Sequence, residues 1–410
     1  MKLLYNAAIY LYTALIHVAG LFNDKAKKMV EGRKGVMEML KEKIDPKADY
    51  IWFHVASLGE FEQGRPIIER IKKEHPELKI LLSFFSPSGY EVRKDYKEAD
   101  VVCYLPMDTL SNARQFLDIC KPKTAVFVKY EFWLNYLDEL KEREIPTFIV
   151  SAIFRQEQAF FKWWGGWYRN CLGNFKHLYV QDEQSVELLK GIGINNATVA
   201  GDTRFDRVLA ICKQAKDLEK VEAFKHGDKP ILVAGSSWPK DEDLLIEYFD
   251  KHNFRMIIAP HEVHEGHIAE IEGKMKRTHV RYTQATAEEA SKADCLIIDC
   301  IGLLSSIYRY GELAYIGGGF GVGIHNVLEP AVYGMPVIFG PNYKRFREAV
   351  EMEKAGAAFP IEDGEQLAKT LDTLLDQTTG RLSETSNIAG KFVEKNCGAT
   401  DIIMKGLFGE

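Results

Sequence analysis

From Tyr50 onward, short apolar runs alternate with longer stretches whose apolar residues recur at helical spacing. The apolar runs show no period-2 alternation, which is typical of parallel strands buried on both faces, so the pattern predicts βαβ units. Six runs are predicted as strands in the first half, at 50–57, 79–84, 101–105, 124–128, 147–151 and 177–181. Five more follow Lys229, at 231–235, 255–260, 295–299, 313–317 and 336–339. The pattern therefore indicates the α/β class.

Each half is expected to form its own doubly wound sheet, so we predict two Rossmann-like domains that face a central cleft, with ligands at the carboxyl ends of the strands. A length of 410 residues suits two domains. The charged stretch 213–229 is interpreted as the connector, with the boundary near Ala210. The tail at 381–397 has helical spacing and is expected to pack back on the first domain. The resulting regions are 1–35, 36–210 and 211–410.

The N-terminal segment is apolar and is followed by a basic stretch. Residues 3–22 are mostly apolar and aromatic, interrupted by Asn6, Thr13 and His17. A run of about 20 residues is just long enough to span a bilayer, but the interruptions suit a helix lying in the membrane interface equally well. A helix docked on its own domain is the third alternative. The cations that follow place the rest of the chain in the cytoplasm; they are Lys25, Lys27, Lys28, Arg33 and Lys34.

Net charge and cysteine content narrow the function classes. A formal net charge of -6 argues against wholesale nucleic-acid binding, because neutralising phosphates needs a clustered basic surface. The seven cysteines are odd in number, scattered and without a CxxC pair, so they are interpreted as reduced residues of a cytosolic protein. We therefore expect no nucleic-acid partner.

Two carboxylates follow buried strands in the first half. Ser57-Leu58-Gly59-Glu60 ends the first predicted strand, and a helix is predicted to begin near Phe61. A carboxylate at a strand's carboxyl end can accept a proton from a sugar hydroxyl, although Glu60 in a first helical turn is also favourable through the helix dipole. Glu131 follows the 124–128 strand in the same way. The residues alone do not assign the two roles.

A glycine run marks the second half. Residues 317–323 follow a strand and lead into His325-Asn326-Val327-Leu328-Glu329-Pro330. Glycine lets the backbone approach a phosphate, and a helix beginning near Asn326 would point free N–H groups at it. Glu329, one turn along, is placed to take ribose hydroxyls. Ser236 and Ser237, at another strand end, supply hydroxyls and amides that suit phosphate or acceptor contacts.

Two patterns resemble metal sites. The acidic triplet 241–243 looks like a metal-holding DxD sequence, but its place at a helix start favours compensation of the helix dipole. His261, His264 and His267 recur every three residues, yet no cysteine or further histidine cluster completes a zinc site. We expect no metal.

Taken together, the motifs resemble the Kdo (3-deoxy-D-manno-octulosonic acid) transferases of lipopolysaccharide biosynthesis, which are metal-independent glycosyltransferases of the GT-B type. The resemblance spans nearly the whole chain, through residues 57–60, 86–89, 131–135, 201–206 and 325–330. It implies an inverting transfer of Kdo from CMP-Kdo, without a cofactor, to a lipid A precursor of the lipid IVA type. It also implies association with the cytoplasmic face of the inner membrane.

The resemblance assigns roles to individual residues. It makes Glu60 the catalytic base and places Ser57, Gly59 and Glu131 at the acceptor or cleft side, in an acceptor-binding domain at 36–210 behind the membrane-associating segment 1–35. It gives the second domain, 211–410, the CMP-Kdo site, with Arg204 as a further phosphate contact. The expected donor residues are Ser236, Ser237, Pro260, His261, Ile301, Gly302, Leu303, His325, Asn326, Val327, Leu328 and Glu329.

Two positions depart from the family pattern. Family members commonly have Pro-Arg-His where this chain has Pro260-His261-Glu262, so His261 or another base such as Arg204 has to replace the arginine. The family's Gly-Glu-Leu appears as Gly302-Leu303-Leu304, which keeps a backbone contact and removes a carboxylate.

Two rival hypotheses stay open: a GT-B-fold epimerase of soluble UDP-sugars, which gives no reason for residues 3–22, and a non-catalytic peripheral membrane protein.

Overall fold

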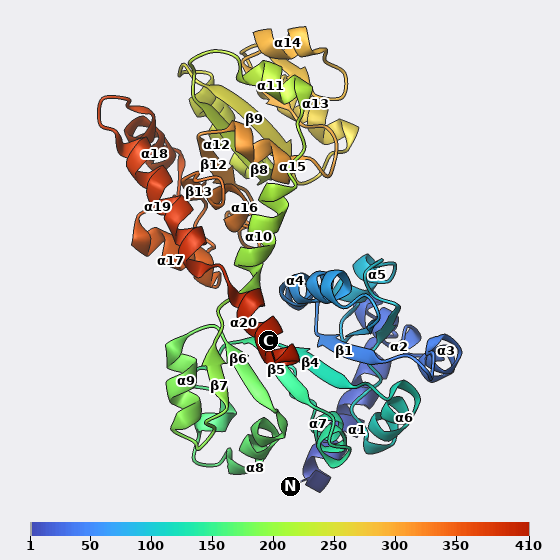
Figure 1. Ribbon diagram of the computed structural model, residues 1–410. Coiled ribbons are helices and arrows are strands. Elements are labelled where there is room, and N and C mark those ends of the chain that lie inside the picture. The colour runs from blue at the N-terminus through green and yellow to red at the C-terminus, as the bar shows by residue number, and fades with distance from the viewer. Residues whose placement is uncertain (1, 410) are drawn as a thin grey trace. The chain divides into compact units, whose positions relative to one another are not determined.

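The computed structural model describes residues 2–409 and divides into two compact units. One unit comprises Met1–Arg207 with Cys397–Glu410, and the other comprises Val208–Asn396. Each contains a seven-stranded, all-parallel sheet with helices on its faces, as Figure 1 shows. The predicted α/β class with two parallel sheets is confirmed.

The sheet of the first unit has the order β3-β2-β1-β4-β5-β6-β7, so β1 and β4 lie side by side near its centre. The strands are continuous apolar runs because helices cover both faces of the sheet and bury the side chains on each. Their bounds are β1 Tyr50–Val55, β2 Lys79–Phe84, β3 Val101–Tyr104, β4 Thr124–Val128, β5 Thr147–Ala152, β6 His177–Val180 and β7 Ala197–Val199.

Helices cover both faces of this sheet. One core layer packs the sheet against α3, α6, α7 and α9, and the other packs it against α4 and the C-terminal α20. The bounds are α1 Lys2–Ala19, α2 Asp24–Glu31, α3 Val36–Lys43, α4 Leu58–Glu74, α5 Pro87–Arg93, α6 Leu110–Cys120, α7 Leu134–Glu142, η1 Ala159–Phe161, α8 Gly166–Arg169, η2 Asn170–Asn174, α9 Glu183–Lys190, α10 Thr203–Lys213, which runs into the second unit, and α20 Ala399–Phe408.

The second unit repeats the architecture with the order β10-β11-β9-β8-β12-β13-β14. Its strands are β8 Ile231–Ser237, β9 Arg255–Pro260, β10 His279–Arg281, β11 Cys295–Ile297, β12 Leu313–Ile316, β13 Val337–Phe339 and β14 Ala358–Pro360. Its helices are α11 Glu219–Lys225, α12 Pro239–Phe249, α13 Glu265–Lys274, α14 Ala287–Lys292, α15 Leu304–Ile307, η3 Tyr308–Tyr310, α16 Leu328–Ala331, α17 Arg347–Ala355, α18 Gly364–Leu375 and α19 Arg381–Asn396.

Every predicted strand is present, most with ends shifted by one or two residues. Three strands were missed: β7, β10 and β14. All three have only three residues and lie at sheet edges, where one side of the strand needs no apolar cover. Their sequences therefore lack the continuous apolar run that marks the central strands.

Two helical regions differ from prediction. The stretch 213–229, predicted to connect the two domains, contains α11, which buries Val221 and Phe224 and packs against α14. The predicted 381–397 helix is α19, which belongs to the second unit. The packing on α4 is instead made by α20, through Phe408 stacked on His75 and Asp401 paired with Arg70.

The N-terminal apolar segment forms α1, which is held by polar contacts along one side. The Tyr5 hydroxyl donates to Asp108 at 2.5 Å, and the Asn135 amide donates to the Asn6 side chain at 2.8 Å. Burial raises the pKa of Asp108 to about 7. Among residues 2–409, no helix combines the length and the apolar character needed to cross a membrane. A position in the membrane interface stays a prediction.

Candidate active site

Glu60 lies in the first turn of α4, at the carboxyl end of the central strand β1. The predicted helix start near Phe61 was wrong by three residues: the helix begins at Leu58 with Ser57 as its N-cap. Ser57-x-x-Glu60 is the sequence signature of such a start. The Ser57 hydroxyl donates to the Glu60 carboxylate instead of capping the backbone, so it orients this acid. Glu60 is half-buried, which leaves it accessible to a substrate hydroxyl.

Glu131 follows β4, the neighbour of β1, so the adjacent ends of two strands carry the two carboxylates. Its Oε2 atom accepts from the Trp133 indole at 2.8 Å and lies 3.0 Å from Nε2 of His54. The other ring nitrogen of His54 lies 2.9 Å from the Ser83 hydroxyl. These contacts are satisfied when His54 carries its proton on Nε2 and donates it to Glu131. The carboxylate of Glu131 is thus fixed by two donors.

Arg204 already has a partner. Its Nε and Nη2 atoms donate to Oδ2 of Asp202 at 2.9 and 2.7 Å. Burial opposes ionisation of Asp202, but the charge and hydrogen bonds of Arg204 hold the pKa of this carboxyl below its ordinary value. To contact a phosphate as predicted, the Arg204 guanidinium would have to do so while it is paired with Asp202.

In the second unit, the ends of β8 and β12 bring Ser236 and Ser237 against the glycine run. A Cβ atom on Gly317 would lie 2.6 Å from the Ser237 Cα and would also collide with the Ser236 carbonyl oxygen, so only glycine permits this approach. Ser236 has a positive φ of 52°. The Ser237 hydroxyl is buried and donates to Oε1 of Glu242 at 2.8 Å, which leaves Ser236 as the freer of the two serines.

Three aromatic rings stack beside this turn. His261 lies between Trp238 and His325, with ring centroids 4.7 and 4.6 Å apart, and Pro260 ends the strand before it. Burial and the neighbouring His261 lower the pKa of His325. His261 itself is exposed. The structure thus places two predicted donor residues, His261 and His325, in direct contact.

A pocket of about 380 Å³ adjoins the glycine run. Trp238, Gly318 and Phe320 line it together with Lys240, whose ammonium lies 4.6 Å from the centre of the Phe320 ring. Sequence reasoning missed Lys240 and Trp238. The signal was their position just after Ser236 and Ser237, at the end of a predicted strand.

The helix of the His325–Pro330 motif begins later than predicted. The expected start near Asn326 was wrong, because α16 begins at Leu328 and has only four residues. Asn326 is exposed; its side chain accepts from the Leu328 N–H at 3.1 Å and donates to Glu329 at 3.0 Å. The side chains of Val327 and Leu328 are buried in the core, so only their backbone can face a donor.

Ile301, Gly302 and Leu303 follow β11. Ile301 is 82% exposed and Gly302 has a φ of 87°, so this turn presents backbone and an apolar side chain to solvent. Within the described chain, neither the Ile301 nor the Leu303 side chain bonds to the His261–His325 group.

The three acidic residues 241–243 all pair with other residues of the second unit. Asp241 accepts from Tyr315, Gly318 and Trp238, Glu242 is 2.8 Å from His267, and Asp243 pairs with Lys274 at 2.7 Å. Burial raises the pKa of Glu242; for His267 burial opposes protonation, but the Glu242 carboxylate raises the pKa above its ordinary value. His264 caps α13. These contacts support the interpretation of the triplet as structural.

His54 contacts the candidate site in the first unit, but sequence reasoning assigned it no role. It lies inside β1, where a histidine in an apolar run signals a satisfied core residue as readily as a functional one. Only the pairing of β1 with β2 and β4 shows that Ser83 and Glu131 meet its two nitrogens.

The fold has solved counterparts that are distant in sequence. UDP-GlcNAc 2-epimerase from Neisseria meningitidis, bound to UDP-GlcNAc, superposes with a TM-score of 0.61 at 14% identity, covering 88% of this chain and 100% of that one. A glycosyltransferase from Rickettsia africae ESF-5 gives a TM-score of 0.55 at 14% identity, covering 88% and 97%. At such identities the likeness shows the fold alone, which is the GT-B fold.

Sequence comparison points to one family among proteins with the GT-B fold. Residues 29–207 match the family model described as 3-deoxy-D-manno-octulosonic-acid transferase (kdotransferase). The 3-deoxy-D-manno-octulosonic acid transferase of Aquifex aeolicus (strain VF5) is 27% identical over 366 residues, which cover 87% of this chain and 95% of that relative. The resemblance drawn from the motifs is confirmed: the first half of the chain matches the Kdo transferase family model, and most of the chain is similar to a curated Kdo transferase.

Proposed function

We propose that the protein transfers Kdo from CMP-Kdo to a lipid A precursor of the lipid IVA type at the cytoplasmic face of the inner membrane. The observation that carries this proposal is the pair of oriented carboxylates at adjacent strand ends. Glu60 is held by the Ser57 hydroxyl, and Glu131 is held by His54 and Trp133. The residues matched by the family model, 29–207, include both carboxylates.

The proposed reaction is one inverting displacement. Glu60 accepts the proton of an acceptor hydroxyl, whose oxygen forms a bond to the anomeric carbon of Kdo. The bond from that carbon to the phosphate oxygen of CMP breaks, and CMP leaves with the electron pair. The fixed carboxylate of Glu131 accepts a hydrogen bond from the acceptor and orients it. Stabilisation of the phosphate charge that develops on CMP favours the transition state.

The second unit supplies the donor site in this proposal. The glycine run and Ser236 bring backbone within reach of a phosphate, and Lys240 contributes positive charge at the adjoining pocket. Trp238, which lines that pocket, offers a stacking surface for the cytosine base. Asn326 and Glu329 remain the proposed contacts to the ribose. The epimerase rival rests on a fold likeness alone and no residue contact favours it.

No resident cofactor or metal enters the proposed reaction. We expect transfer to continue at the wild-type rate in excess chelator, because both oriented carboxylates have protein donors and the 241–243 acids are bound within the fold. The measurement is Kdo transfer with and without EDTA after dialysis. A loss of activity that only a divalent ion restores would overturn metal independence.

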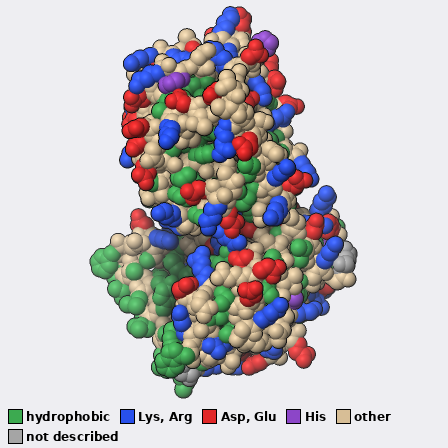
Figure 2. All heavy atoms as spheres, turned by 90° about the vertical axis from the view of Figure 1, so that its left-hand side faces the viewer, with side chains coloured by type: hydrophobic (Ala, Val, Ile, Leu, Met, Phe, Trp, Pro, Cys, Tyr) green, Lys and Arg blue, Asp and Glu red, His purple; other side chains and the backbone are tan. Residues whose placement is uncertain are grey.

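An exposed apolar surface supports the proposed membrane contact. On α1 only Ile9 is buried, while Leu11 and Leu15 are 62% and 57% exposed. Figure 2 shows hydrophobic side chains gathered on one part of the N-terminal unit. Trp163 in the same unit is 93% exposed, so part of the aromatic stretch 160–164 also faces solvent. Such a surface is typical of a monotopic protein.

The variant Leu11→Glu/Leu15→Glu is expected to bind anionic vesicles at least about tenfold more weakly, since each buried leucine contributes about 1.5–3 kcal/mol. Transfer to detergent-dispersed acceptor should persist. These substitutions leave Tyr5 in place, whereas deleting the segment would remove the Tyr5 hydroxyl that donates to Asp108. Val92→Glu, at a 56% exposed position on α5, is the matched control in co-sedimentation. If both variants sediment alike, α1 is not the anchor and the Trp163 region becomes the candidate.

A further inference from the structure

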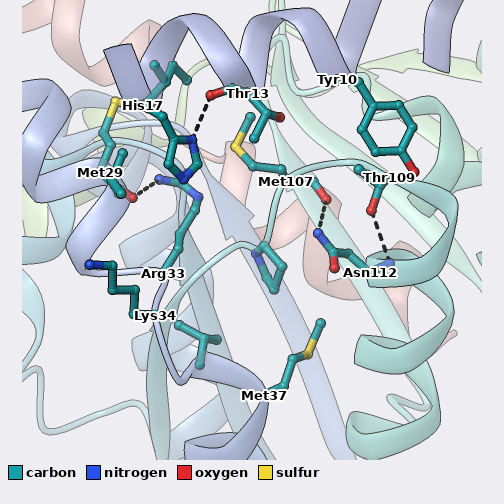
Figure 3. Close-up of a pocket in the computed structure, with 14 residues that line it drawn as sticks. Tyr10, Thr13, His17, Met29, Arg33, Lys34, Met37, Met107, Thr109 and Asn112 are labelled. Carbon is teal, nitrogen blue, oxygen red and sulfur yellow. Dashed lines mark hydrogen bonds between the residues drawn. The ribbon is translucent and has the colours of Figure 1, made fainter. Parts of the chain in front are cut away.

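A separate groove lies between α1, α2, α3 and the loop after β3. It has a volume of about 300 Å³ and lies within the first unit. Figure 3 shows His17, Arg33 and Lys34 on one side of it and Thr109 and Asn112 on the other. Apolar side chains make up most of the remaining wall: Ile16, Met29, Val30, Val36, Met37, Pro106 and Met107.

The charged side chains that line the groove are all basic. It contains two permanent cations and a histidine but no aspartate or glutamate, in a chain whose net charge is -6. Lys34 is exposed and has no ion pair within residues 2–409. His17 uses Nδ1 on the Thr13 carbonyl at 2.8 Å, which leaves Nε2 available. The groove is therefore apolar inside and basic at its edge.

Arg33 is a half-buried cation without a counter-ion. Its guanidinium donates to the carbonyls of Leu105, Met29 and Phe85 at 2.8, 2.9 and 2.7 Å, and no carboxylate of residues 2–409 pairs with it. Burial lowers the pKa of Arg33 to about 10. A guanidinium has five N–H donors, so two remain after these three bonds. Buried charges are ordinarily paired, which points to an anion supplied from outside the chain.

We propose that this groove binds the lipid acceptor itself, with one hydrocarbon chain among the methionines and an adjoining phosphate against Arg33 and Lys34. An anionic amphiphile matches both the apolar interior and the basic edge, and methionine walls adapt to a flexible chain. The exposed apolar face of α1 borders the groove, so the chain can enter from a membrane. This inference rests on the proposed function, because it names a subsite for that acceptor.

Contacts connect the groove to the carboxylates. Arg33 donates to the Phe85 carbonyl and lies over the Phe85 ring at 4.8 Å. The Phe85 ring stacks on Trp133 with centroids 4.7 Å apart, and Trp133 donates to Glu131. A lipid held at Arg33 is thereby placed two side chains from the Glu131 carboxylate. The groove positions the acceptor, while Glu60 performs the chemistry.

Binding can be measured without turnover. The probe is dihexanoyl phosphatidic acid below its micellar concentration, added to the full-length protein, with dihexanoyl phosphatidylcholine and inorganic phosphate as comparisons. We expect saturable binding of phosphatidic acid, weaker binding of phosphatidylcholine and no detectable binding of phosphate alone. Tetraacylated lipid A precursor should displace the probe at concentrations at which phosphatidylcholine does not. Binding that the precursor does not displace would assign the groove to bulk lipid and overturn the proposal.

Two substitutions test the site, each with a matched control. Lys34→Ala should weaken probe binding about tenfold, the scale of one hydrogen bond to a charged group, whereas Lys27→Ala removes an equal charge outside the groove and should not. Met37→Trp should fill the groove and abolish binding, whereas Val18→Trp adds the same side chain to the exposed face of α1. Thermal melts identify any variant that unfolds, and Val30→Trp then replaces Met37→Trp.

Turnover separates this inference from the proposed function. If the wild type transfers Kdo, Lys34→Ala should raise the KM for the acceptor about tenfold and leave the KM for CMP-Kdo unchanged. If the wild type transfers no Kdo but binds the probe with the expected variant pattern, the proposed function fails while an anionic-lipid site stands. Equal binding by Lys34→Ala and Lys27→Ala, together with equal binding by Met37→Trp and Val18→Trp, would overturn the groove assignment.

Discussion

Glu60→Gln is expected to reduce Kdo transfer at least about 100-fold while leaving folding and CMP binding intact, because general-base catalysis contributes about 10²–10⁴-fold. Glutamine has nearly the same size and can still accept the Ser57 hydroxyl, so α4 should begin as it does now. What the amide lacks is the ability to remove a proton. Initial rates with saturating CMP-Kdo, together with a thermal melt, measure the effect.

The control for this variant lies two residues further along the same helix. Glu62→Gln removes an equal charge, but its carboxylate pairs with Arg93 at 2.9 Å on the surface of α4. Such pairs contribute about 0–1 kcal/mol, so Glu62→Gln should turn over nearly as the wild type does. Equal activity of Glu60→Gln and Glu62→Gln would remove Glu60 from the chemistry.

Gly317→Ala is expected to lower kcat/KM for CMP-Kdo at least about 100-fold, the scale on which a 1 Å misplacement acts. The new methyl group would meet the backbone of Ser236 and Ser237, which cannot swing away as a flexible side chain can. The ends of β8 and β12 would have to separate, which moves the phosphate-facing turn. A stability loss of about 1–3 kcal/mol should accompany the change.

Gly321→Ala is the matched control because it lies in the same glycine run. Its nearest neighbour beyond the adjacent residues would be the Gly318 carbonyl oxygen at 3.6 Å, an ordinary contact distance. We expect nearly wild-type affinity for CMP, measured by calorimetry on both variants. Unchanged CMP affinity in Gly317→Ala would show that the glycine run does not form the donor site.

The central strands could be predicted because burial on both faces leaves a plain sequence signal. The bounds of β2, β4 and β9 agree with prediction at both ends, and the strands that carry Glu60 and Glu131 on their following loops were found. Short edge strands such as β7 carry no such signal, since one side of them needs no cover. The same applies to α11, whose two buried residues, Val221 and Phe224, are too few to show helical periodicity.

The site was predictable only where its residues follow one another in the sequence. Ser57-x-x-Glu60 is such a case. The contact of His54 with Glu131 joins residues 77 positions apart, and that of Arg33 with Phe85 joins residues 52 apart, so both depend on sheet order and helix packing. The stack of Trp238, His261 and His325 likewise requires β8, β9 and β12 to be neighbours. These contacts could not be read from local pattern.

The most direct test incubates the purified protein with a CMP-Kdo-generating system and tetraacylated lipid IVA, and determines the lipid products by mass spectrometry. The proposed function predicts a lipid product heavier by one or more Kdo units, together with release of CMP, and it predicts both to form at least about 100-fold more slowly with Glu60→Gln. A lipid that keeps its starting mass while the wild-type protein remains folded and binds CMP-Kdo would contradict the proposed transfer.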